Sequence, residues 1–196
     1  LRDICDRHDI LLISDEVITG MGRTGKWFAC EHDGVSPDMI ATGKGMTSGY
    51  TPMGAVLFHE RNISAFAATG KTVPFGHTFS ANPLSAATCG AVLKYMRDQD
   101  VLENVAARGK QLEAGLRRLA QRYPWMADVR GRALLWGFEF VTDPQSRTPP
   151  DPALNANALF TAPCFPAGLV VYTAGIAPLN NATLLAPPLV ITEAEM

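Results

Sequence analysis

Short apolar runs alternate with helical patterns along the first half of the chain, and this alternation limits the folds open to it. Strand-like runs are expected at 10–14, 38–42 and 53–58, with helices at 1–8 and 60–68. This order is typical of an α/β fold with a mainly parallel sheet, in which ligands bind at the carboxyl ends of the strands. The residues that follow each run are therefore the first candidates for a functional site.

Two of these runs end in residues with the chemistry of an active site. The first leads to the carboxylate of Asp15, and the second leads to Lys44, an amine between two glycines. Taken singly, such a lysine is usually a solvated loop cation, and such an acid usually belongs to a turn or a helix cap. At neighbouring strand ends, an acid and an amine can work as a pair, and a glycine hinge suits a lysine that must reach a bound carbonyl cofactor. Lys44 is the candidate nucleophile.

Three stretches of sequence, in this order and spacing, carry a family resemblance. They are 14–25 (SDEVITGMGRTG), 38–44 (DMIATGK) and 76–83 (GHTFSANP). Together they resemble the class III aminotransferases, the ω-transaminase group of the fold-type I pyridoxal-phosphate enzymes. The resemblance implies that residues 1–98 form the second part of the large, mainly parallel-sheet domain, and that 99–196 form the C-terminal α+β small domain.

The resemblance also assigns roles to individual residues. Lys44 matches the lysine that forms a Schiff base with pyridoxal 5'-phosphate, and Asp15 matches the acid that pairs with the ring nitrogen. Val17 matches an apolar residue packed on the ring face, for which ordinary core packing is the alternative. Thr78 matches a threonine that donates to the cofactor phosphate of the partner subunit in a homodimer, with a helix cap as the alternative. Glu16 carries no signal of its own beyond the motif.

The implied activity is transfer of an amino group from a small-molecule amine or ω-amino acid to a 2-oxo acid, by a ping-pong mechanism. In the same family, the same lysine and acid also serve aminomutases, racemases and a decarboxylase, so these remain alternatives, as does a catalytically inactive fragment. Many members carry an arginine that binds the substrate carboxylate at about the position of Tyr172. The identity of the acceptor therefore does not follow from these residues.

A glycine-rich stretch offers a remote alternative from another class of protein. Residues 20–25 fit the G-x-G-x-x-G pattern of nucleotide-binding modules, and with Lys26 they nearly fit a P-loop. However, Trp27 stands where a P-loop needs the Ser or Thr that holds magnesium. The following residues also pass through Gly34 and Pro37 without opening a long helix to receive a phosphate. We expect a turn that shapes a loop.

Two helical patterns follow in the middle of the chain. One runs over 83–98 and would join the two domains, and another starts at Val101. The second pattern places apolar residues at helical spacing, which predicts one buried side that belongs to the core. These residues are Val101, Val105, Leu112, Leu116 and Leu119.

The composition changes after 123–124, and the remainder indicates the small α+β domain. A strand is expected over 129–140, where polar and apolar residues alternate, and a proline-rich loop is expected over 143–152. Two further short strands are expected at 168–172 and 183–187.

Charge and cysteine content argue against several kinds of partner. The 19 acidic and 17 basic residues give a net charge of −2 without long runs of one sign, so neither nucleic acid nor a membrane surface is an expected partner. No apolar stretch is long enough to cross a bilayer. The four cysteines lack zinc-binding spacing, which favours a reducing, cytoplasmic location and no metal site.

Both ends of the sequence look cut. Residues 1–8 read as the last turns of a helix without a start signal, and 192–195 have the pattern of a capping box whose helix would begin where the chain stops. We therefore expect a fragment that corresponds to the C-terminal half of a longer enzyme.

Overall fold

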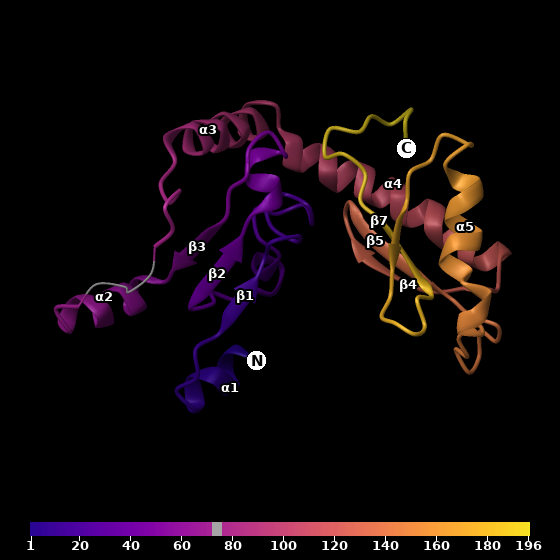
Figure 1. Ribbon diagram of the computed structural model, residues 1–196, viewed down its shortest axis with the longest axis horizontal. Helices are drawn as coiled ribbons and strands as arrows, with labels where there is room; N and C mark the ends of the chain where they lie inside the picture. The colour runs from indigo at the N-terminus through magenta and orange to yellow at the C-terminus, as the bar shows by residue number, and fades with distance from the viewer. Residues whose placement is uncertain (72–75) are drawn as a thin grey trace. The chain divides into compact units, whose positions relative to one another are not determined.

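The computed structural model describes residues 1–71 and 76–196. The chain divides into two compact units, Leu1–Leu102 (unit 1) and Glu103–Met196 (unit 2), each with its own sheet and helices (Figure 1). Among the described residues, none of the helices combines the length and the apolar character that crossing a membrane requires.

Unit 1 contains a three-stranded sheet in the order β1-β2-β3. Its elements are α1 (Arg2–Arg7), β1 (Ile13–Asp15), η1 (Ala29–Asp33), β2 (Met39–Thr42), η2 (Lys44–Thr47), β3 (Ala55–Phe58), α2 (Glu60–Ala68) and α3 (Pro83–Asp98). β1 and β2 pair in parallel, whereas β3 pairs antiparallel with β2. The α/β class is confirmed, but these three strands are not mainly parallel. The connection from β2 to β3 carries only the short η2 turn and no crossover helix, so β3 returns antiparallel.

A single buried carboxylate holds the elements of unit 1 together. Asp38, directly before β2, has 0% of its surface exposed. One carboxylate oxygen accepts hydrogen bonds from the Leu12 amide at 2.8 Å and from the Arg2 guanidinium at 2.7 Å, and the other accepts from Nε of Arg61 at 2.6 Å. The Leu12 amide and the two guanidinium groups hold the pKa of Asp38 well below its usual range, against the effect of burial. Asp38 thus joins α1, α2 and the start of β1 to β2.

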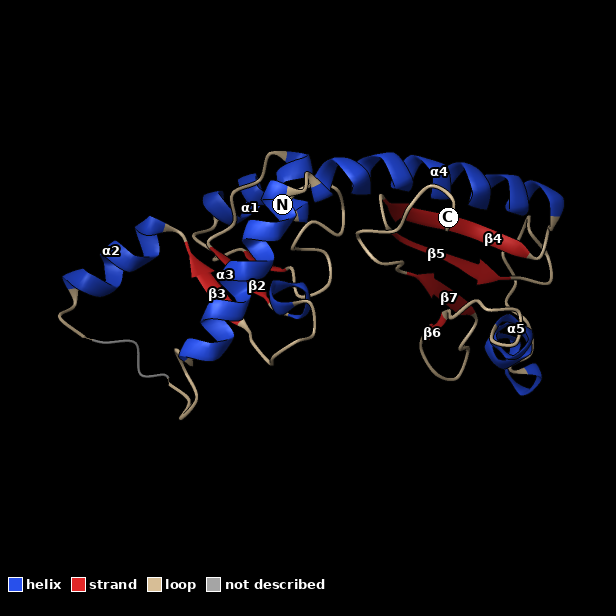
Figure 2. Cartoon of the chain, turned by 90° about the horizontal axis from the view of Figure 1, so that it is seen from above, coloured by secondary structure: helices blue, strands red, loops and turns tan. Residues whose placement is uncertain are grey.

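Unit 2 combines an antiparallel sheet with helices (Figure 2). Its elements are α4 (Val101–Arg122), which begins just before the unit boundary, β4 (Met126–Arg132), β5 (Leu135–Phe140), η3 (Pro152–Leu154), α5 (Ala156–Cys164), β6 (Tyr172–Ala174) and β7 (Ala182–Leu185). The strand order is β4-β5-β7-β6. The single strand expected over 129–140 is wrong, because the chain turns at Ala133 and forms a hairpin there. α5 was not expected from the sequence.

The core of unit 2 lies on one face of this sheet. Trp136, Phe138 and Phe140 alternate along β5 and are 2–7% exposed, and Leu116 of α4 belongs to the same cluster. Phe160 of α5 packs against that cluster as well. The expected apolar side of the helix is confirmed for Val101, Val105 and Leu116, which are at most 4% exposed, and Leu112 is partly buried. Leu119, in contrast, is 45% exposed.

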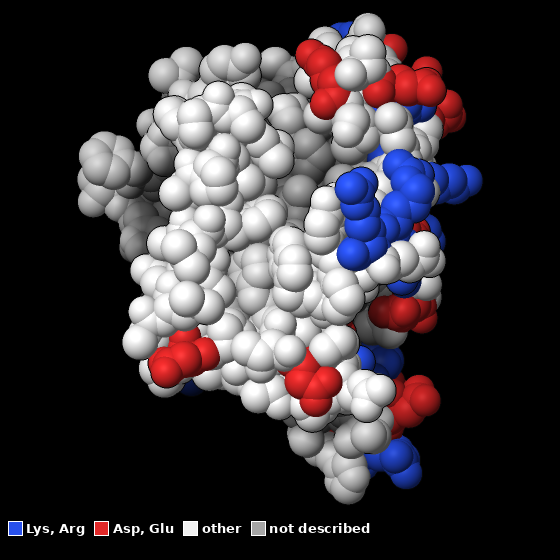
Figure 3. Space-filling view, turned by 90° about the vertical axis from the view of Figure 1, so that its right-hand side faces the viewer, with Lys and Arg blue, Asp and Glu red and all other residues white. Residues whose placement is uncertain are grey.

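The outer surface of unit 2 includes a large area without charge. Residues 148–192 carry one charged side chain, Asp151, and Figure 3 shows a broad surface with few Lys, Arg, Asp or Glu side chains. Phe165, Val170 and Ile176 are 74–85% exposed. Unit 2 thus exposes several large apolar side chains on a surface with few charges.

A close contact between α4 and the β4–β5 hairpin yields a first prediction. A Cβ atom at Gly109 would lie 2.4 Å from the Cα of Ala133, whereas at Gly115, in the same helix, the nearest atom is the end of the Arg118 side chain at 3.9 Å. Gly115→Ala should stabilise the protein by about 0.5–1 kcal/mol, because alanine is the better helix former. Gly109→Ala should instead destabilise it by roughly 1–3 kcal/mol, because the backbone of the hairpin must move.

The measurement is the free energy of unfolding of the two variants of the full-length protein in urea. The two glycines share one helix, so helix propensity is matched between them. A stabilising effect of Gly109→Ala would contradict the close contact.

A second prediction concerns Asp38. Asp38→Asn should destabilise the protein by about 1–3 kcal/mol, because it removes charge-assisted hydrogen bonds to a buried carboxylate, while both arginine partners keep contact with solvent. Urea unfolding of the full-length protein tests this, with Asp33→Asn at an exposed position as the control for loss of one negative charge. Equal stabilities of the two variants would show that the Asp38 cluster does not hold unit 1 together.

The same carboxylate predicts how stability depends on pH. The folded pKa of Asp38 lies below the unfolded value of about 4, so the folded state binds fewer protons than the unfolded state in this range. The stabilisation is therefore fully present above about pH 4 and is lost as the pH falls further. Asp38→Asn should flatten this acid limb of the stability curve.

Candidate active site

The structure places Asp15 and Lys44 at one edge of the unit 1 sheet. Asp15 is the last residue of β1 and lies opposite Ala41 of β2, and Lys44 begins η2 just after β2 ends. Because the two strands are parallel, both residues lie at the carboxyl-terminal edge of the sheet. This is the edge at which α/β proteins bind ligands. Both side chains are exposed in this chain. Their catalytic roles stay predictions.

Asp15 makes one local hydrogen bond and retains capacity for another. Its Oδ1 accepts from the amide of Val17 at 3.1 Å, which is the turn-forming contact that an acid after a strand commonly makes. Within residues 1–71 and 76–196, its second carboxylate oxygen has no hydrogen-bond partner. That oxygen can therefore accept a hydrogen bond from a ligand at the sheet edge.

Lys44 has an uncommon backbone conformation. Its φ of +36° lies in the left-handed region, where a residue other than glycine costs roughly 1–3 kcal/mol and is often found at functional sites. Gly43, directly before it, lies against Val17, because a Cβ at Gly43 would be 4.0 Å from Cγ1 of Val17. Val17 is half-buried, so its methyl groups lie beside the backbone that carries the lysine.

Thr78 lies in an exposed turn before α3. The turn is closed by the Ser80 amide, which donates to the His77 carbonyl at 2.9 Å. The N-cap of α3 is Asn82, whose Oδ1 accepts from the Leu84 amide at 3.0 Å. The helix-cap alternative for Thr78 is therefore wrong, and its exposed hydroxyl remains available to a ligand.

Glu16 is the residue whose importance sequence reasoning missed. It is 1% exposed, and its carboxylate accepts from the Ala29 amide at 2.9 Å, from the Cys30 amide at 2.8 Å and from the hydroxyl of Thr19. Burial would raise the pKa of Glu16, but these hydrogen bonds outweigh it and lower the pKa below its ordinary value. Glu16 thus anchors the loop that follows β1.

One sequence signal could have indicated this burial. Side chains alternate in direction along an extended strand end, so Asp15 and Val17 share one side while Glu16 points to the other. The alternation therefore places Glu16 on the side opposite Asp15 and Val17, although it does not identify the amides that Glu16 binds.

The glycine-rich stretch 20–25 lacks the context of a nucleotide site. Thr24 is 6% exposed, and its carbonyl and hydroxyl oxygens lie 3.0 and 3.2 Å from Nε2 of His32. Between 26 and 59, all of which is described, the helical elements are the short η1 and η2 turns. The long helix whose N-terminus would receive a phosphate is thus absent from this stretch.

Comparison with known proteins identifies the family. The model of the family Aminotransferase class-III matches residues 1–196. The chain is 37% identical over 199 residues to adenosylmethionine-8-amino-7-oxononanoate aminotransferase of Nitratidesulfovibrio vulgaris, which covers 100% of this chain and 36% of that protein. It is 35% identical over 201 residues to taurine–pyruvate aminotransferase of Bilophila wadsworthia, covering 100% of this chain and 44% of that protein.

Solved structures agree in fold over almost the whole chain. A transaminase from the marine bacterium Virgibacillus superimposes with a TM-score of 0.93 at 31% identity, covering 99% of this chain and 44% of that one. An amine transaminase from an uncultivated Pseudomonas species, in its PLP-bound form, gives 0.89 at 37% identity, covering 99% and 43%. The chain thus spans less than half the length of these relatives. It belongs to the class III aminotransferases, the family that its three sequence motifs resemble.

Proposed function

We propose that the complete protein is a pyridoxal-phosphate-dependent aminotransferase that moves an amino group from a small-molecule amine to a 2-oxo acid. The observation that carries this proposal is the placement of Lys44 and Asp15 at one carboxyl edge of parallel strands, in a chain that matches the family along its whole length. Because the chain spans less than half of its relatives, the activity is assigned to the complete polypeptide.

The residues present suit the chemical groups of pyridoxal phosphate. The cofactor has an aldehyde, a basic ring nitrogen, a flat apolar ring and a phosphate dianion. The chain offers an exposed amine at Lys44, a carboxylate oxygen of Asp15 that has no partner among the described residues, the methyl groups of Val17 and the exposed hydroxyl of Thr78. When bound, the cofactor supplies an electron sink for the carbon that loses its proton.

Each of these residues would have a distinct task. Lys44 would bind the aldehyde carbon through its Nζ and, once a substrate amine displaces it, would carry a proton to and from the reacting carbon. Asp15 would hold the proton on the ring nitrogen through its second oxygen, which strengthens electron withdrawal by the ring. Val17 would support the ring face, and Thr78 would donate to the phosphate.

The proposal extends to assembly, domains and location. We assign unit 1, expected as 1–98, to the cofactor-binding large domain and unit 2, expected as 99–196, to the small domain. Thr78 would reach the partner's cofactor in a homodimer, which its exposed position in a turn supports. All four cysteines are free thiols, which supports a reducing, cytoplasmic location.

The central prediction concerns covalent attachment at Lys44. Borohydride treatment of the full-length protein with pyridoxal phosphate should leave a fixed adduct on Lys44, located by mass spectrometry. Lys44→Ala and Lys44→Arg should both lose this adduct completely, because arginine keeps the positive charge but not the primary amine. Lys110→Ala, at an exposed position in α4, should keep it. An adduct that persists in Lys44→Arg would overturn the assignment.

A further prediction separates the phosphate role of Thr78 from a structural one. Thr78→Val should weaken pyridoxal-phosphate binding roughly 10–100-fold, the effect of losing a hydrogen bond to a charged group, and should change stability by less than about 0.5 kcal/mol. Asn82→Ala should have the reverse profile, with a stability loss of about 1 kcal/mol from the missing cap. Cofactor titration and urea unfolding give the two readouts, and unchanged affinity in Thr78→Val would remove Thr78 from the site.

A further inference from the structure

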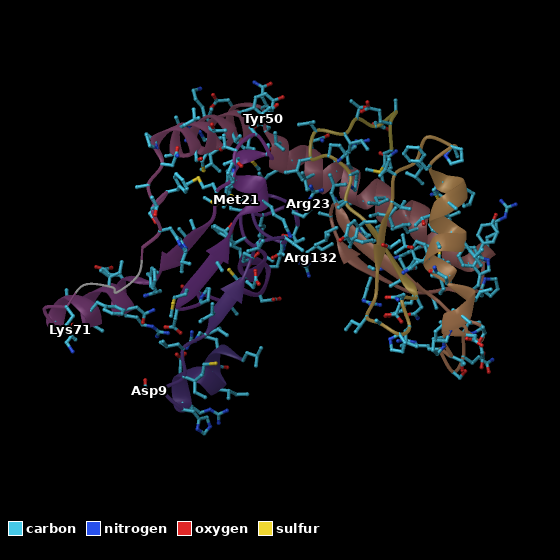
Figure 4. The ribbon with its side chains drawn as sticks, viewed as in Figure 1. Asp9, Met21, Arg23, Tyr50, Lys71 and Arg132 are labelled. Carbon is cyan, nitrogen blue, oxygen red and sulfur yellow. The ribbon has the colours of Figure 1, made fainter. Side chains whose placement is uncertain are left out.

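The backbone directly after Lys44 is in close contact with Met21. A Cβ atom at Gly45 would lie 2.9 Å from the Cβ of Met21, closer than Cβ atoms normally approach, and 3.6 Å from its Cγ. Figure 4 shows Met21 beside the η2 turn, which begins at Lys44. Glycine at position 45 therefore allows the Met21 side chain to rest on the peptide backbone that carries the lysine.

Met21 is itself held firmly in place. It is 7% exposed and forms a buried cluster with Met46 of η2 and Cys89 of α3. Its φ of +55° is in the left-handed region, as is that of Lys44. Two residues other than glycine thus adopt an unfavourable conformation on the two sides of one contact, which the surrounding structure must stabilise.

Glu16 fixes the segment that carries Met21 at both of its ends. The Glu16 carbonyl accepts a hydrogen bond from the Gly20 amide at 3.0 Å, and a Cβ at Gly20 would lie 2.7 Å from that oxygen. The Glu16 carboxylate accepts from the amides of Ala29 and Cys30, beyond the turn. Met21 therefore projects from a closed loop.

We propose that the 20–25 turn positions Lys44. Met21 of this turn packs against Gly45 and so restrains the backbone next to the lysine. The inference rests on the proposed function, because it assumes that the Lys44 amine is the reacting group. The glycines of this motif would then serve close contacts within the protein: the Gly20 amide donates to the Glu16 carbonyl, and the turn holds Met21 against Gly45, the residue after the lysine.

The physical need for such an element follows from the flexibility of lysine. Its side chain has four rotatable bonds, so a fixed backbone is the main restraint on where Nζ can reach. A displacement of about 1 Å at a reacting group can slow a reaction by roughly a hundredfold. The contact at Gly45 acts on the residue next to Lys44, where a small shift moves the amine directly.

A double-mutant cycle tests the contact in the full-length protein. Gly45→Ala should slow borohydride-trapped attachment of pyridoxal phosphate to Lys44 by about a hundredfold, because the new methyl group collides with Met21. Met21→Gly combined with Gly45→Ala removes the opposing Cβ and should recover at least about tenfold of that loss. A double variant that is as slow as Gly45→Ala would overturn the proposal.

A second pair of variants keeps the test decisive if Gly45→Ala does not fold. Met21→Ala keeps the Cβ atom but removes the part of the side chain that packs with Met46 and Cys89, so the turn should lose its hold on Gly45 and trapping at Lys44 should slow by about tenfold or more. Met21→Leu, which keeps the side-chain volume, should retain the wild-type rate. Met96→Ala is the matched control: Met96 is a methionine of unit 1 that is 4% exposed, so its loss should lower thermal stability without changing the trapping rate. Equal trapping rates in Met21→Ala and wild type would also overturn the proposal.

The same readout separates this inference from the proposed function. Absence of any adduct on Lys44 in the wild-type protein would refute the function itself. Normal trapping in both the wild type and Gly45→Ala would leave the function standing and refute only the role of the 20–25 turn.

Discussion

The parallel pairing of β1 with β2 determines where the candidate site forms, and Asp38 determines that pairing. The Asp38 amide donates to the Leu12 carbonyl at 2.8 Å, and its carboxylate accepts from the Leu12 amide at the same distance. The register that follows places Asp15 opposite Ala41. A shift of one residue would turn Asp15 to the other face of the sheet. The charged cluster around Asp38, at one end of the strands, thus fixes the register and thereby determines which residues lie side by side at the other end.

The neighbouring carboxylates Asp15 and Glu16, at the end of β1, have opposite surroundings. Asp15 is exposed and keeps an oxygen for a ligand, whereas Glu16 is buried and has its oxygens occupied by amides and a hydroxyl. The alternation of an extended backbone separates the two environments within one peptide unit. The exposure of Asp15 and the anchoring of the loop by Glu16 are therefore coupled, since neither carboxylate can move to the other side of the strand without moving its neighbour.

Elements with strong boundary signals could be predicted from the sequence. The helices expected at 60–68 and 83–98 have those bounds in the structure, and α3 starts at the Asn82 cap followed by proline, a combination that is visible in the sequence. The hairpin turn at Ala133 was missed because alanine there has a φ of +50°, a conformation that usually requires glycine or asparagine. α5 was missed because it contains Pro163 and no charged residue to mark its ends.

The candidate site also contains features that the sequence indicates and features that it does not. The positions of Lys44 and Asp15 at neighbouring strand ends could be predicted, because each follows a short apolar run that is visible in the sequence. The burial of Glu16 depends on amides of Ala29 and Cys30, distant along the chain, and the environment of Asp38 depends on Arg2 and Arg61. Nothing local in the sequence reports such partners. The partners of a carboxylate that organises a fold through distant donors are therefore harder to predict than the placement of a carboxylate at a strand end.

The glycine motif at 20–25 shows why a local pattern is ambiguous. A glycine allows another group to approach the backbone closely, and in nucleotide-binding loops that group is a phosphate. In this chain the group that approaches Gly20 is the carbonyl of Glu16, and the residue between the first two glycines packs against Gly45. In both cases the missing side chain of glycine makes room for another group. That group is part of the protein here and a ligand in nucleotide-binding loops. The deciding feature lies outside the motif, in the helix that a phosphate site needs and that does not follow Gly25.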